Sequence, residues 1–196
     1  RIRALRDIPK HGVKAGDLGG YIQDELHLSQ EGSAWVAADS KVFNSAYVKD
    51  DAIVKNDSIV RHFASIKDKA KVNNSFVSGS AIIKENAQVE SQTEVYGNSS
   101  IGGNAIVKDK TNVFGEAKIY GDAVVKNAEV YGMAQINGNA QVIDKARVYG
   151  RAIITDRAIV GGNISIKGDA FLDGDAYLYG LEMDENFFEA EPELER

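Results

Sequence analysis

The chain has 196 residues, with 23 Lys or Arg, 29 Asp or Glu and a formal net charge of −6. Since a typical domain has about 150 residues, this length suggests a single domain or one elongated body with small attachments. The chain has no Cys, which excludes disulfides and zinc–thiolate sites and fits a reducing cytosol. No apolar run approaches the roughly 18 residues of a membrane helix, so we expect a cytoplasmic protein without membrane partners.

Residues 1–33 lack the strict repeat that follows them in the chain. The end of a stack of repeats exposes its core unless a terminal segment covers it. We therefore expect residues 1–33 to form an N-terminal cap.

Residues 34–180 repeat every six residues. The aliphatic positions fall in three runs of hexads, Val36 to Val72, Val77 to Val125 and Val130 to Leu178. All 25 carry Val, Ile or Leu, and Ala, Ser or Thr stands two residues earlier in every hexad except that of Ile164. Since side chains two residues apart share a face of a strand, each hexad predicts a short strand with a small and an aliphatic residue facing inward.

Each predicted strand is followed by a corner residue. Gly, Asn or Asp stands two residues after the aliphatic position in 21 of the 25 hexads. These residues adopt positive φ at low cost, so each hexad should end in a tight corner. Because every hexad points the same face inward, successive strands cannot form hairpins, and the chain is predicted to coil.

The repeat shortens by one residue at two places, Asn74 and Asn127. The two places are nine hexads apart. If three hexads make one turn, both short corners should lie on the same edge of a three-sided solenoid.

Residues 181–196 carry seven acidic groups and one basic group around Asn186-Phe-Phe188. They hold all of the net charge, because residues 34–180 carry seventeen charged groups of each sign. We expect an acidic tail after the solenoid. A charge-balanced body has no basic stripe to neutralise phosphates, so no nucleic-acid partner is expected.

The hexads, of which Val36-Ala-Ala-Asp-Ser40-Lys is one, resemble the hexapeptide-repeat family. The resemblance implies an all-β fold, a left-handed parallel β-helix with three hexads per triangular turn. Twenty-five hexads would make about eight turns, roughly 40 Å long at about 4.8 Å per strand. The stretches 14–22 and 28–36 are similar to the start of uncharacterised bacterial and phage proteins described as acyltransferase-like.

The family resemblance also implies an enzyme chemistry. Hexapeptide-repeat acyltransferases use acyl-CoA and a His that acts as general base. His62 is the candidate base here, since it occupies a corner that elsewhere prefers Gly, Asn or Asp, and Asn44, one turn earlier at the same corner, would orient it. His also tolerates positive φ, which gives His62 a purely structural alternative. A zinc site needs three clustered ligands, and the repeat contains one His, so no metal is expected.

Outward positions on equivalent strands predict two apolar surfaces. The first is an aromatic ladder just after the aliphatic positions, made of Tyr96, Phe114, Tyr131 and Tyr149. The second is a stripe just before them, made of Trp35, Ile53, Ile106, Val124, Ile159 and Tyr177. Aligned apolar residues form contiguous patches, which usually mark contact surfaces. Two alternatives are that such residues simply stabilise strands, or that the ladder stacks on sugar rings.

The sequence is compatible with two functions. The first is a non-catalytic scaffold or protein-interaction module of phage or prophage origin that needs no cofactor and self-associates through these surfaces. The resemblance implies a homotrimer for such a protein. The alternative is an acyl-CoA-dependent acyltransferase. No loop interrupts the 25 hexads to form the usual active site, which favours the scaffold.

Overall fold

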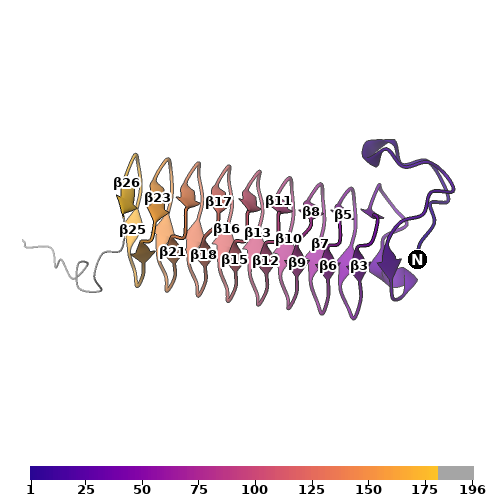
Figure 1. The fold of residues 1–196 in the computed structure, drawn as a ribbon, viewed down its shortest axis with the longest axis horizontal. Coiled ribbons are helices and arrows are strands. Elements are labelled where there is room, and N and C mark those ends of the chain that lie inside the picture. Colours follow the sequence, from indigo (N-terminus) through magenta and orange to yellow (C-terminus); the bar gives the residue numbers. More distant parts are fainter. Residues whose placement is uncertain (181–196) are drawn as a thin grey trace, which may run out of the picture.

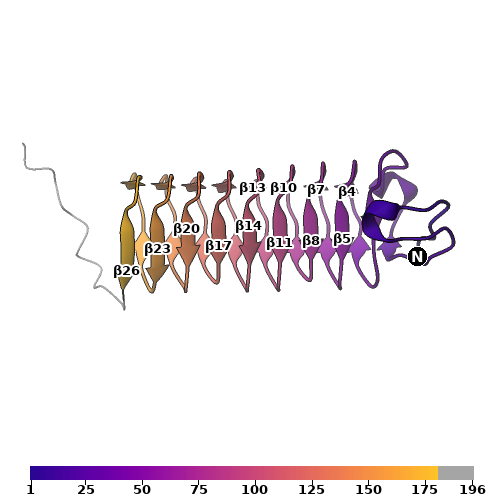
Figure 2. The ribbon, with the colours of Figure 1, turned by 90° about the horizontal axis from the view of Figure 1, so that it is seen from above.

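Residues 1–180 are described by a computed structural model (Figure 1). They form an all-β parallel solenoid with three sheets and about nine turns, so the predicted fold class is confirmed. Figures 1 and 2 show the strands stacked along the long axis, with the N-terminal segment at one end. The predicted acidic tail, residues 181–196, lies outside the described residues.

Each turn passes through the three sheets in the same order. Sheet I contains β2 (Trp35–Val36), β5 (Ile53–Lys55), β8 (Lys71–Asn73), β11 (Gln88–Glu90), β14 (Ile106–Lys108), β17 (Val124–Lys126), β20 (Gln141–Ile143), β23 (Ile159–Gly162) and β26 (Tyr177–Gly180). Sheet II contains β1 (Tyr21–Ile22), β3 (Lys41–Val42), β6 (Ile59–Val60), β9 (Phe76–Val77), β12 (Glu94–Val95), β15 (Asn112–Val113), β18 (Glu129–Val130), β21 (Arg147–Val148) and β24 (Ser165–Ile166). Sheet III contains β4 (Tyr47–Val48), β7 (Ser65–Ile66), β10 (Ile82–Ile83), β13 (Ser100–Ile101), β16 (Lys118–Ile119), β19 (Gln135–Ile136), β22 (Ile153–Ile154) and β25 (Phe171–Leu172).

The solenoid has about nine turns rather than the predicted eight or so. The difference arises within residues 1–33, where β1 pairs in parallel with β3 and Leu28 pairs with Val48. Both segments follow the course of the solenoid without matching the hexad pattern. The hexads alone therefore undercount the turns.

Residues 1–20 form an antiparallel arm over the first turn. Arg3 pairs with Leu18 and Ile8 pairs with Val13, close to the short 3₁₀ helix η1 (Pro9–His11). A second 3₁₀ helix, η2 (Glu25–His27), precedes Leu28. The arm packs Ala4, Ile8 and Val13 against Trp35 in a small hydrophobic cluster of its own.

The core is built by the two inward positions of each hexad. The aliphatic residues from Val36 to Val160 and most of the small residues between them are almost completely buried. Six small positions carry hydroxyls, and all of them except Ser40 donate a hydrogen bond to a nearby backbone carbonyl. Thr93 Oγ1 donates to the carbonyl of Glu90 at 2.7 Å, and Thr111 Oγ1 donates to that of Lys108 at 2.6 Å. These hydroxyls lie in the core beside the aliphatic side chains.

The corners adopt the left-handed conformation whatever residue they carry. Positive φ occurs at 24 of the 25 corner positions, including the four that are not Gly, Asn or Asp: Ala38, His62, Glu85 and Ser91. Most Gly corners stack directly on one another. A Cβ built on Gly97, for example, would lie 2.7 Å from the carbonyl oxygen of Gly115. The glycine columns therefore permit close approach of successive turns as well as positive φ.

Both short corners lie on the same edge, as the repeat predicted. Asn74 connects β8 to β9 and Asn127 connects β17 to β18, so both join sheet I to sheet II. Four full corners on this edge, such as Asp109-Lys110, place two successive residues at positive φ, whereas each short corner has one. The agreement supports three hexads per turn.

Candidate functional site

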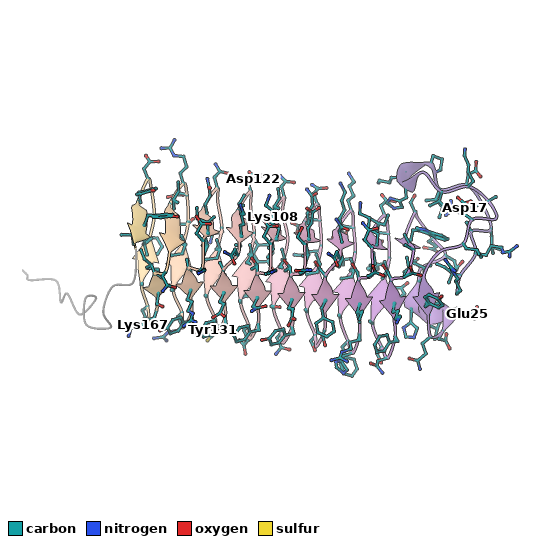
Figure 3. The ribbon with its side chains drawn as sticks, in the orientation of Figure 1. Asp17, Glu25, Lys108, Asp122, Tyr131 and Lys167 are labelled. Atoms are coloured by element: carbon teal, nitrogen blue, oxygen red, sulfur yellow. The ribbon has the colours of Figure 1, made fainter. Side chains whose placement is uncertain are left out.

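The aromatic ladder lies at the edge between sheets II and III. Each ring follows a sheet II strand and precedes the glycine that turns the corner. Adjacent ring centroids along the ladder are 5.0, 4.8 and 4.8 Å apart, with interplanar angles of 3° or less. These values match the spacing between stacked strands, because equivalent side chains repeat once per turn. In Figure 3, Tyr131 and Lys167 lie along this edge.

The ladder is partly open to solvent. Tyr96 is 36% exposed, and Phe114, Tyr131 and Tyr149 are half-buried. Burial, followed by the neighbouring Tyr149 and the carboxylate of Glu129, raises the pKa of Tyr131, while Arg147 opposes the shift. Its hydroxyl therefore stays neutral at physiological pH. The ladder presents a rigid and uncharged aromatic surface about three turn spacings long.

The two sides of the ladder are polar. On sheet II, Arg147 Nε lies 3.2 Å from Glu129 Oε2. On the other side runs a shallow groove of about 430 Å³, in which the polar residues Glu116, Lys118, Gln135, Arg151 and Asp169 surround Met133 and Ile153. Met133 is 52% exposed. An apolar centre with a polar rim is the usual arrangement of a protein–protein interface.

The predicted stripe on sheet I is not continuous. In the register of the sheet, Lys71 and Gln88 separate Ile53 from Ile106, and Gln141 separates Val124 from Ile159. The stripe therefore divides into adjacent pairs, Trp35 with Ile53, Ile106 with Val124 and Ile159 with Tyr177, and both members of the middle pair are half-buried.

Trp35, the first residue of the predicted stripe, is not available as a surface residue. Its side chain is 5% exposed, because the arm of residues 1–20 covers it. Trp35 therefore belongs to the cap cluster, and the aromatic ladder is the better candidate for a contact surface.

His62 and Asn44 lie at equivalent corners of adjacent turns, at the edge between sheets II and III. Both adopt positive φ, 60° and 62°, so the corner itself accounts for their unusual backbone. His62 Nδ1 lies 2.8 Å from Ser78 Oγ of the following turn. The backbone N–H of Asn44 donates to Gln23 Oε1 at 2.9 Å. The structure thus brings the two residues into one column, but the hydrogen bond that holds the imidazole comes from Ser78.

The two other histidines lie near the cap. His27 is buried, and its Nδ1 lies 2.7 Å from the carbonyl oxygen of Ala46.

Residues 1–180 contain no group of three His, Cys, Asp or Glu side chains arranged to hold a metal ion. In the same part of the chain, no helix is long and apolar enough to cross a membrane.

Acidification should weaken the cap through His11. Burial lowers the pKa of His11 below its ordinary value of 6.5, and its buried Nε2 has no hydrogen-bond partner among the described residues. The unfolded cap then binds more protons than the folded one, so its stability should fall as pH decreases through about 6.5. We expect Trp35 fluorescence to report this loss between about pH 7 and 5. A His11→Gln variant should lack the transition, and an unchanged pH profile in that variant would contradict the assignment.

The sequence did not predict a cavity of about 510 Å³ between the arm and the first turn. It is lined mainly by apolar side chains, among them Ile2, Leu5, Ile22 and Leu28. Its one sequence signal is the alternation of Arg with Ile and Ala over residues 1–4. This alternation gives the arm one charged and one apolar face.

No protein-family model matches the chain, and no curated protein is similar to it in sequence. The class is therefore defined by the fold: this is a three-sided parallel β-solenoid. Its candidate functional surface is the aromatic ladder at one edge.

Proposed function

We propose that this protein is a non-catalytic scaffold of the hexapeptide-repeat type, with a left-handed coil, that associates with copies of itself through the aromatic ladder. The observation that carries the proposal is the stacking of four rings in register on an edge that residues 1–180 leave partly exposed. Aromatic residues are enriched at the centres of interfaces. Burying them favours association by about 25 cal/mol per Å², before the cost of lost freedom.

The assembly that we propose is a homotrimer. A contact between the ladder of one copy and a different face of the next is heterologous, and a three-fold rotation closes it. The half-buried pair Ile106 and Val124 on sheet I is one candidate for the opposing face. A protein partner of another kind would use the same ladder.

The proposal predicts that a Phe114→Glu/Tyr131→Glu variant dissociates. Two carboxylates at the centre of an apolar contact would have to be buried without partners, which is strongly unfavourable. Light scattering at tens of micromolar should give three times the chain mass of 21.2 kDa for the wild type and a monomer for the variant.

An Asn56→Asp/Gln92→Glu variant is the matched control, because it adds the same charge at the edge between sheets I and II, away from the ladder, at two exposed corner residues. It should keep the wild-type mass. A monomeric wild type would overturn the proposed self-association, and an intact oligomer in the ladder variant would exclude the ladder as its interface.

The acyltransferase alternative depends on the family resemblance and on His62, whose imidazole is held by Ser78. A bound acyl-CoA would raise the apparent melting temperature by mass action. A thermal shift with acetyl-CoA or succinyl-CoA, and its loss in a His62→Ala variant, would favour the enzyme over the scaffold. The scaffold proposal expects no shift at millimolar concentrations of either compound.

A further inference from the structure

The cavity under the N-terminal arm has the properties of a binding site. Its volume of about 510 Å³ lies within the range of ligand pockets, about 300–1,000 Å³, and its lining is mainly apolar. Leu5, on the lining, is 89% exposed. Arg3 and Arg6 also line the cavity, against one acidic residue, Glu25. Figure 3 shows Glu25 at this end of the solenoid. An occupant should therefore combine apolar side chains with negative charge.

We infer that this cavity binds Phe187 and Phe188 of a second copy of the chain. These are the two adjacent aromatic residues of segment 181–196, which carries seven acidic groups and one basic group. Phenylalanine side chains match the apolar lining, and the flanking carboxylates match Arg3 and Arg6. Charge complementarity of this kind steers association and fixes the orientation of the partner.

The chain length requires that the two phenylalanines come from another copy. Sheet I has nine strands from β2 to β26, so the last turn is eight strand spacings from the first, about 38 Å at about 4.8 Å each. Eight residues separate Gly180 from Phe188, and a fully extended chain of that length spans at most about 28 Å. Phe188 therefore cannot reach the cavity of its own chain.

The charges of the last turn do not attract the acidic segment. That turn carries Asp169, Asp173 and Asp175 against Lys167. The two nearby arginines are already engaged: Arg151 forms a bidentate pair with Asp169, and Arg157 forms one with Asp175, all at 2.6–2.8 Å. The three aspartates and these three basic residues balance, so this end offers an acidic segment no excess positive charge, whereas the cavity at the other end does.

The resulting contact joins the C-terminal end of one solenoid to the N-terminal end of the next. Such a contact is heterologous, and without a closing rotation it adds copies in a line. It differs from the ladder contact, which places solenoids side by side. The two contacts use different residues, so each can be removed while the other is kept.

Fluorescence of Trp35 provides the test, because it is the one Trp of the chain and lines the cavity. A synthetic peptide of residues 181–196, titrated into the full chain, should change the Trp35 emission in a saturable way. A peptide with Phe187→Ala and Phe188→Ala should bind at least about tenfold more weakly. An Arg3→Glu protein should also bind the native peptide at least about tenfold more weakly.

In the full chain, the wild type should grow beyond the trimer mass only at concentrations above the tens of micromolar used for the ladder test, and a Phe187→Ala/Phe188→Ala variant should stay at the trimer mass there. The Phe114→Glu/Tyr131→Glu variant should bind the peptide with unchanged affinity, which separates failure of this inference from failure of the proposed function. An unchanged Trp35 signal up to millimolar peptide, or equal binding of the native and alanine peptides, would overturn the inference.

Discussion

Replacing Ile119 with alanine is expected to lower the free energy of unfolding by about 2–5 kcal/mol. Ile119 lies on β16 near the middle of the solenoid, is completely buried and pairs with Ile101 and Ile136 in the neighbouring turns. Because the neighbouring turns are held by their own hydrogen bonds, the site cannot collapse to fill the cavity. For a chain of this length, the melting temperature should fall by about 2–4 °C per kcal/mol.

Thermal unfolding followed by circular dichroism checks this expectation, at one protein concentration so that any assembly contributes equally. Lys118→Ala is the matched control, because Lys118 is the exposed neighbour on the same strand. It should change stability by less than about 0.5 kcal/mol. Equal losses in the two variants would show that the inward column does not carry the stability.

The second large effect is expected at Gly115. Its φ is +73°, and an added Cβ would lie 2.9 Å from both the backbone nitrogen and the carbonyl oxygen of Gly132 in the next turn. An alanine there carries the cost of the left-handed conformation, about 1–2 kcal/mol, and also forces the two turns apart. We expect an additional loss of about 1–3 kcal/mol from that overpacking.

Gly168→Ala separates the two contributions. Gly168 has a similar φ of +66°, but an added Cβ would have no atom within 4 Å. This variant should show the conformational cost alone, measured by the same unfolding experiment. If Gly115→Ala is no more destabilising than Gly168→Ala, close stacking of the glycines is not what limits substitution at this corner.

Much of the architecture could be predicted because each hexad repeats the same local physics. The alternation of Ala and Val predicts which side chains face inward, and the corner residues predict where the chain turns. The interruptions of the sheet I stripe could also be predicted from the sequence, because the polar residues Lys71, Gln88 and Gln141 occupy the same hexad position as Ile106. Taking those three positions into account would have separated the apolar residues into short groups.

The rest depends on contacts that no repeat encodes. The burial of Trp35 follows from an antiparallel arm formed by residues 1–20, whose course over the first turn has no hexad signature. The same arm creates the cavity. Likewise, the hydrogen bond between His62 and Ser78 depends on a side-chain rotamer at one corner. The position of His62 could be predicted from the sequence, but its partner could not.

The two short corners imply that the three edges differ in how much change in chain length they accept. Along the other two edges, glycine corners stack at contact distance, so an added residue would push whole turns apart. The edge between sheets I and II already joins its strands by either five-residue or six-residue steps without disturbing the pairing on either side. Inserted loops, whether acquired by the gene or placed by design, should be accepted at this edge, leaving the ladder and the cap in place.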